Sequence, residues 1–142
     1  MELYISAVKA VRGQSWGDKN TLETIFGIKG MHGWGLVPGL AGWLTLDTRT
    51  NGPTPVEASI ERHCVPCNGS VTVPLIAQAQ ETGGFWEGKD EFGSSTEAIT
   101  LTCDCEVCSK WIAVNFTAGG VGRGGIEIQV SARHIPGGCC SS

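Results

Sequence analysis

Seven cysteines are the side chains best suited to chemistry in this chain, and most of them fall in two short clusters. The first cluster spans residues 64–67 and the second spans residues 103–108. Each cluster contains a Cys-x-x-Cys step, which points two sulfur atoms toward one spot. Four thiolates at the corners of a tetrahedron are a common ligand set of a structural Zn²⁺ site. The sequence therefore predicts a zinc ion bound by four ligands, Cys64, Cys67, Cys105 and Cys108.

The segments that flank both clusters have the composition of β-strands. Residues 58–63 and 71–76 flank the first cluster, and residues 98–103 and 111–116 flank the second. They are rich in β-branched and aromatic residues, and several alternate apolar and polar side chains as half-buried strands do. Each cysteine turn is therefore expected to join two strands.

This order of strand, cysteine turn and strand, repeated twice, resembles a zinc ribbon over about residues 57–116. Ribbon knuckles usually carry Pro between the cysteines and Gly just after them, and Pro66 and Gly69 keep both devices in the first knuckle. The second knuckle has neither, so Cys103 stays an alternative ligand to Cys105. The resemblance implies a fold element and a bound metal rather than an activity, because similar modules serve unrelated functions.

Two further interpretations of the cysteine clusters stay open. His63 directly precedes Cys64 and could replace a cysteine as a ligand. The same sulfurs could instead pair as disulfides, which hold many small secreted domains together. Residues 1–6 lack the basic region and apolar core of a secretory signal, so synthesis in a reducing cytoplasm is expected. That expectation favours metal over disulfide bonds.

Composition limits the partners and activities to be expected. The chain has 142 residues, a formal net charge of −4 and 17% charged residues. An acidic chain with scattered basic residues is not expected to bind the phosphate backbone of nucleic acid. No apolar stretch is long enough to span a membrane. No nucleophile with a paired base and no catalytic pair of carboxylates is evident, so we do not expect an enzyme.

Strand signals along the chain favour an all-β fold. The 21 glycines suit turns and short strands better than long helices. Residues 3–11 and 43–47 have strand composition, and residues 126–135 alternate most regularly between apolar and polar side chains. We predict a single domain over residues 1–142, in which seven or eight antiparallel strands form a small sandwich or barrel. The domain would have little helix and would carry the zinc-ribbon section.

Three other segments have less definite signals. Residues 21–28 fit either a short helix or a strand, because periodicity alone does not separate the two. Residues 80–96 are polar and are expected to form a loop. Residues 31–43 interleave glycines with Met31, Trp34, Trp43 and other apolar side chains. This glycine-rich stretch either packs its aromatic side chains into the core or contacts a partner protein or membrane.

The C-terminal residues 137–142 are expected to form a flexible tail that carries Cys139 and Cys140. Adjacent cysteines rarely bond to each other, because the required geometry is strained. These two thiols are therefore candidates for disulfides between chains in an oxidising environment. The alternative is a pair of thiols on a frayed end.

Together these features predict a non-catalytic structural protein, stabilised by a zinc ribbon, that assembles with itself or with other subunits. A bacteriophage head or tail component, made in the cytoplasm and built into the virion, is the most concrete version. The alternative is a zinc-ribbon regulator of transcription or translation that binds nucleic acid. Its candidate basic and aromatic patch consists of Arg62, Lys110, Trp111 and Phe116. A third class, an enzyme with a structural zinc, lacks catalytic groups in the sequence.

Overall fold

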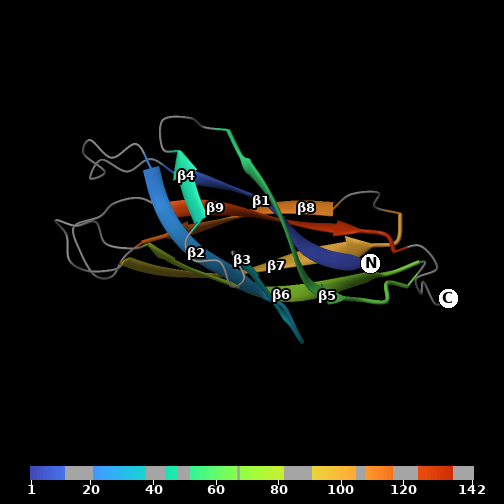
Figure 1. Cartoon of the computed structure of the whole chain (residues 1–142). Coiled ribbons are helices and arrows are strands. Elements are labelled where there is room, and N and C mark those ends of the chain that lie inside the picture. The colour runs from blue at the N-terminus through green and yellow to red at the C-terminus, as the bar shows by residue number, and fades with distance from the viewer. Residues whose placement is uncertain are drawn as a thin grey trace.

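The chain folds as two β-sheets packed face to face (Figure 1). The computed structural model describes residues 1–11, 21–37, 44–47, 52–66, 68–81, 91–104, 108–116 and 125–135. All pairings between the described strands are antiparallel, and none of the described residues is helical. The predicted all-β fold is confirmed. Of the two predicted forms, the described strands adopt the sandwich, because they form two separate sheets rather than one closed sheet.

Nine strands belong to the described part of the chain. They are β1 (Glu2–Val11), β2 (Thr21–Lys29), β3 (Trp34–Val37), β4 (Leu44–Asp47), β5 (Thr54–Arg62), β6 (Ser70–Glu81), β7 (Glu91–Thr102), β8 (Cys108–Asn115) and β9 (Gly125–Arg133). Sheet A has the strand order β5-β1-β9-β8. Sheet B has the order β3-β2-β6-β7, and β4 pairs with β2 on the same side as β3.

One continuous hydrophobic core fills the space between the sheets. The predicted apolar face of residues 126–135 lies in it, because β9 runs through the middle of sheet A and buries every second side chain. The fully buried members are Ile126, Ile128, Val130 and Ala132. Strand β6 of sheet B faces them with a matching alternation, and its buried side chains are Val73, Leu75, Ala77 and Ala79. The period-two pattern is thus explained by sheets that each present one face to the core.

Strand β2 settles the ambiguity of residues 21–28. Its residues Thr24, Phe26 and Ile28 are buried in the core, whereas Ile25 is partly exposed and Gly27 lies beneath Leu36 of β3. The backbone pairs with β6 on one side and with β3 and β4 on the other. Pairing on both sides satisfies the backbone in the extended form, and a short helix could not use these partners.

The expected polar loop over residues 80–96 is wrong at both ends. Strand β6 continues to Glu81 and β7 begins at Glu91, and these two residues pair with each other. The polar residues 94–96 belong to β7, the edge strand of sheet B. Its outward side chains face solvent, so a polar composition is compatible with a strand whose backbone pairs with β6.

Candidate functional site

Both cysteine clusters lie in connections that pass from one sheet to the other. The first connection runs from β5 of sheet A to β6 of sheet B, and the second runs from β7 of sheet B to β8 of sheet A. The prediction that each cluster lies between two strands is therefore confirmed. Because each connection changes sheets, neither one closes a hairpin between paired strands.

The two connections meet at one end of the sandwich. Ser70, which begins β6, pairs with Thr102, which ends β7, so the first connection ends where the second begins. The start of β8 lies near the start of β1, because Cys108 and Leu3 both pair with Ala132. The N-terminus lies at this end as well (Figure 1). We call this region, residues 63–70 and 102–108, the cysteine end.

The described cysteines differ in exposure and bonding. Cys64 is exposed, whereas Cys103 and Cys108 are half-buried and pack against the core. Cys64 and Cys108 are each disulfide-bonded. The other cysteines of the predicted ligand set and of the predicted inter-chain bonds lie outside the described residues; they are Cys67, Cys105, Cys139 and Cys140.

The cysteine end meets part of what a four-thiolate site requires. It brings both connections to one place, as tetrahedral coordination by two Cys-x-x-Cys steps demands. Among the described residues, which do not include Cys67 and Cys105, no group of three possible ligands forms. A sulfur in a disulfide is not a thiolate, so zinc binding at Cys64 and Cys108 requires reduction of their disulfides. The zinc ribbon stays a prediction.

Beside the cysteine end, the Glu61 carboxylate fastens β5 to the turn between β2 and β3. It accepts hydrogen bonds from the backbone N–H groups of Met31 at 3.0 Å, His32 at 2.7 Å and Gly33 at 3.0 Å. His63 Nε2 also contacts the Glu61 carboxylate. Burial raises the pKa of Glu61, but the three backbone hydrogen bonds and His63 hold the pKa below its ordinary value overall.

His63, the alternative metal ligand, is thus in contact with the Glu61 carboxylate. Its side chain is 9% exposed and that of Glu61 is 5% exposed. The Met1 ammonium donates a hydrogen bond to the His63 carbonyl oxygen at 2.6 Å. The role of Glu61 had no signal in the sequence, because a glutamate on a strand normally indicates a solvent-facing position.

The outer face of sheet A is charged, and its charges pair with one another. Arg133 contacts the carboxylates of Glu2 and Glu57, each at 2.6 Å, and Lys9 contacts Glu127 at 3.0 Å. The Lys9 ammonium also lies 4.6 Å from the centre of the Trp111 ring. Trp111 is therefore partly covered by its own chain.

The structure does not bring the candidate nucleic-acid patch together. Phe116 is buried, and Lys110 contacts Glu97 at 3.1 Å. Arg62 ends β5, whereas Lys110 and Trp111 lie on β8, and these strands form opposite edges of sheet A.

The outer face of sheet B has the opposite character. Trp34 and Leu36 on β3 are 42% and 55% exposed, and Ile76 on β6 is 37% exposed. Gly35 and Val37 point inward, so the predicted glycine-rich stretch contributes to both the core and the surface. Trp34 is therefore a surface side chain, and the interpretation of this residue as a core aromatic is wrong.

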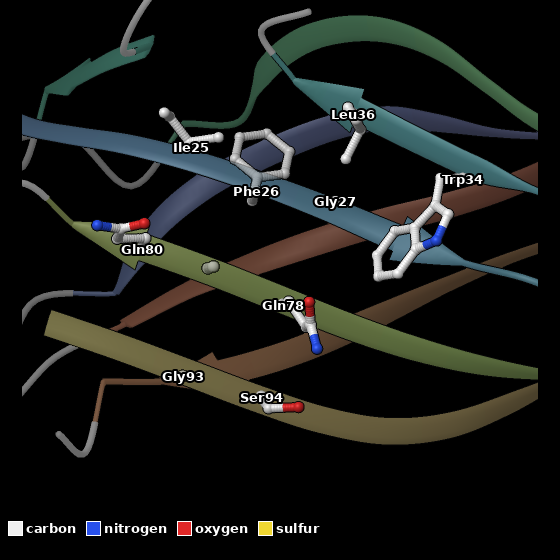
Figure 2. Close-up of a pocket in the computed structure, with 10 residues that line it drawn as sticks. Ile25, Phe26, Gly27, Trp34, Leu36, Gln78, Gln80, Gly93 and Ser94 are labelled. Carbon is white, nitrogen blue, oxygen red and sulfur yellow. The ribbon is translucent and has the colours of Figure 1, made fainter.

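A hollow of about 530 Å³ lies on this face between β3 and β7 (Figure 2). Gly27 lies in its wall between Trp34, Leu36 and Gln78, all of which Figure 2 shows around it. The Leu36 side chain lies over Gly27, because a Cβ atom at Gly27 would be 2.6 Å from Leu36 Cδ2. We call this feature the Gly27 hollow; it is lined by Ile25, Phe26, Gly27, Trp34, Leu36, Gln78, Ala79, Gln80, Gly93 and Ser94.

No protein-family model matches the chain, and no curated protein or solved structure matches it either. In the part of the chain that the structure describes, no helix is long and apolar enough to cross a membrane. The two features that stand out as candidate sites are the cysteine end and the outer face of sheet B.

Proposed function

We propose that this chain is a non-catalytic structural subunit of a larger protein assembly. A component of a bacteriophage virion is the most concrete form of the proposal. The observation that carries it is the apolar outer face of sheet B, where Trp34, Leu36 and Ile76 are exposed together. Grouped apolar side chains on a sheet face usually mark a contact with another molecule, because a monomeric domain gains nothing from exposing them.

The contrast between the two outer faces supports this assignment. On sheet A the charged side chains pair with one another and Lys9 covers part of Trp111. Such a surface is suited to solvent, and its fixed ion pairs offer little to a partner. Sheet B instead presents Trp34, Leu36 and Ile76 among amides and hydroxyls, with few charged side chains among those described, and this composition is close to that of an interface core.

The proposal includes a Zn²⁺ ion at the cysteine end of the reduced protein. Its ligands would be Cys64, Cys67, Cys105 and Cys108, with Cys103 and His63 as alternatives. The support is the convergence of the two cysteine-bearing connections at one end of the sandwich. Because each connection joins sheet A to sheet B, a metal there would hold the two sheets together and stiffen the subunit.

Sedimentation of the natural protein tests this function. Lysate or particles from the producing cells would be separated on a density gradient and probed with an antibody against the chain. We expect the chain in fractions far heavier than its 14.9 kDa monomer. Recovery only as a free monomer or dimer would contradict the role as a subunit of a larger assembly.

A further inference from the structure

The outward side chains of β2 form a short pattern that is complementary to itself when the strand is reversed. Thr24, Phe26 and Ile28 point into the core. The outward positions are Glu23, Ile25, Gly27 and Lys29, in that order along the strand. This order places an anion, an apolar side chain, a glycine in the wall of the hollow and a cation in succession, and Leu36 lies over part of the glycine. Reversal of the strand about Phe26 exchanges Glu23 with Lys29 and Ile25 with Gly27.

We propose that the outer face of sheet B binds a second copy of this chain, face to face, with the two β2 strands antiparallel. The two-fold axis lies in the contact plane and crosses β2 near Phe26. Glu23 of each copy then faces Lys29 of the other, and Ile25 of each copy enters the Gly27 hollow of the other. This inference builds on the proposed function, because it names the partner of the same surface.

The neighbouring strands show the same complementarity in size. On one side of β2, Trp34 pairs with Lys29 and Thr45 pairs with Glu23. The reversal that brings Glu23 to Lys29 therefore also brings Thr45 of one copy to Trp34 of the other. Trp34 and Thr45 are both exposed, so a large side chain meets a small one on each side of the axis. An isologous contact needs such paired projections and recesses on a single face.

The strand on the other side of β2 adds polar complementarity. Gln78 pairs with Gly27 and Gln80 pairs with Ile25. The same reversal places Gln78 of one copy opposite Gln80 of the other. Each amide carries both a donor and an acceptor, so two amides can satisfy each other when water leaves the contact.

Charge also favours a second copy as the occupant. The chain carries a net charge of −4, so two copies repel each other unless they meet through a neutral face. On β2, β3, β6 and β7, the charged side chains on the outer face among those described are Glu23 and Lys29, which have opposite signs. Glu97 of β7 is exposed as well, but it pairs with Lys110 of sheet A. One cation per face gives little attraction for nucleic acid or an anionic membrane.

The contact would be small but within the range of specific interfaces. The face is four strands wide, because β3 and β4 lie end to end along β2, and about 4.8 Å per strand over about 30 Å gives roughly 600 Å² per copy. Stacked sheets pack about 10 Å apart with their strands within about 30° of each other, which keeps residues near the axis in register. We expect a dimer with a dissociation constant in the micromolar range.

The test measures dimerisation of the full chain by sedimentation equilibrium. All proteins would carry Cys139→Ser and Cys140→Ser, so that no disulfide from the tail joins two chains. Glu23→Lys and Lys29→Glu each create two like-charge contacts across the axis, and each is expected to raise the dissociation constant about tenfold. The double variant Glu23→Lys/Lys29→Glu restores both ion pairs and is expected to dimerise as the parent does.

This set of variants separates the effect of the Glu23–Lys29 ion pairs on dimerisation from the effect of net charge. Glu23→Lys makes the chain less acidic and Lys29→Glu makes it more acidic, yet both are expected to weaken the dimer. Trp34→Ala should weaken it as well. Trp111→Ala is the matched control, because it removes a similarly exposed tryptophan from the outer face of sheet A.

A parent protein that stays monomeric at several hundred micromolar would overturn the inference and would indicate a different occupant. A dimer that all four charge combinations leave unchanged would also overturn it, because the contact would lie elsewhere. Neither result touches the proposed function, which the sedimentation of natural assemblies tests separately. Circular dichroism would confirm that each variant is folded.

Discussion

Glu61 shows how a single side chain can connect two sheets that share no backbone ladder. The residue belongs to β5 of sheet A, and its three N–H donors belong to the turn between β2 and β3 of sheet B. The glycines around it leave room for the contact, because a Cβ atom at Gly30 would collide with the Glu61 carboxylate. A buried carboxylate with several N–H donors is a stable arrangement only while it stays charged.

Replacement of Glu61 by Gln should therefore lower stability in a pH-dependent way. At pH 7 the amide loses the charge and presents an N–H₂ group to N–H donors, which should cost about 1–3 kcal/mol of unfolding free energy. Burial raises the pKa of Glu61, but the hydrogen bonds from three backbone N–H groups and the contact with His63 hold the folded-state pKa below its ordinary value. Its contribution is thus fully present above that value and is lost as the pH falls through the lower, folded-state pKa.

Urea unfolding at pH 7 and at about pH 2.5 would measure this difference. The two proteins should differ most at neutral pH, and the difference should shrink as the pH falls through the folded-state pKa of Glu61. Glu127→Gln serves as a control, because that carboxylate forms an exposed pair with Lys9. Equal stability of Glu61→Gln and its parent at pH 7 would contradict a stabilising role of the Glu61 carboxylate.

At the scale of the elements, the sequence predicted a strand best where one face of the strand is buried and the other faces solvent. Strand β9 is of this kind, and its period-two pattern was sufficient, whereas β1 was predicted from its apolar strand composition. Strand β2 is too short for periodicity to exclude a helix. Its pairing with strands on both sides shows that the segment is extended. The first residues of β7 are polar because they lie on an edge strand, so a local reading of composition favours a loop.

The candidate sites show the same limit of local information. The spacing of the cysteines predicted turns between strands, and the structure has them there. Each flanking strand joins one sheet or the other through pairings with strands far away in sequence. The sequence therefore could not predict that both connections pass from one sheet to the other. The Gly27 hollow depends on the register of β2 with β3 and β6, which a single sequence does not contain.

Truncation of a side chain on β9 tests the assignment of that strand to the centre of the core. Ile128 is fully buried, and β9 pairs with strands on both sides. Ile128→Ala should reduce the unfolding free energy by about 2–5 kcal/mol, because it removes buried methyl groups and leaves a cavity. Thr96→Ala on the exposed face of β7 should change it by less than about 0.5 kcal/mol. Similar losses from both substitutions in chemical denaturation would contradict the placement of the core.

At the scale of the whole molecule, the two ends of the described chain are held in one sheet. Strand β1 pairs with β9 along its length, beginning with Glu2 opposite Arg133. Residues 57–116, the section that resembles a zinc ribbon, include β6, β7 and β8 and most of β5, which are divided between both sheets. This section therefore shares one core with β1 and β9, and damage to it should spread through the sandwich.

Zinc removal tests that view together with the metal itself. Reduced protein is expected to bind about one Zn²⁺ per chain, and Cys64→Ser or Cys108→Ser should abolish stoichiometric binding in elemental analysis. Structural zinc contributes on the order of 10 kcal/mol to the folding of small modules, so a chelator should raise hydrogen exchange strongly in the reduced protein. Because the cysteine connections join the sheets, we expect this increase in β1 and β9 as well as in β5 to β8.

Cys103→Ser distinguishes the alternative ligand set, since it should leave zinc binding intact when Cys105 is the ligand. Reduced, folded protein that contains no zinc would contradict the metal site. An increase confined to residues 57–116 would instead show that the cysteine end stabilises a separate unit and does not hold the two sheets together.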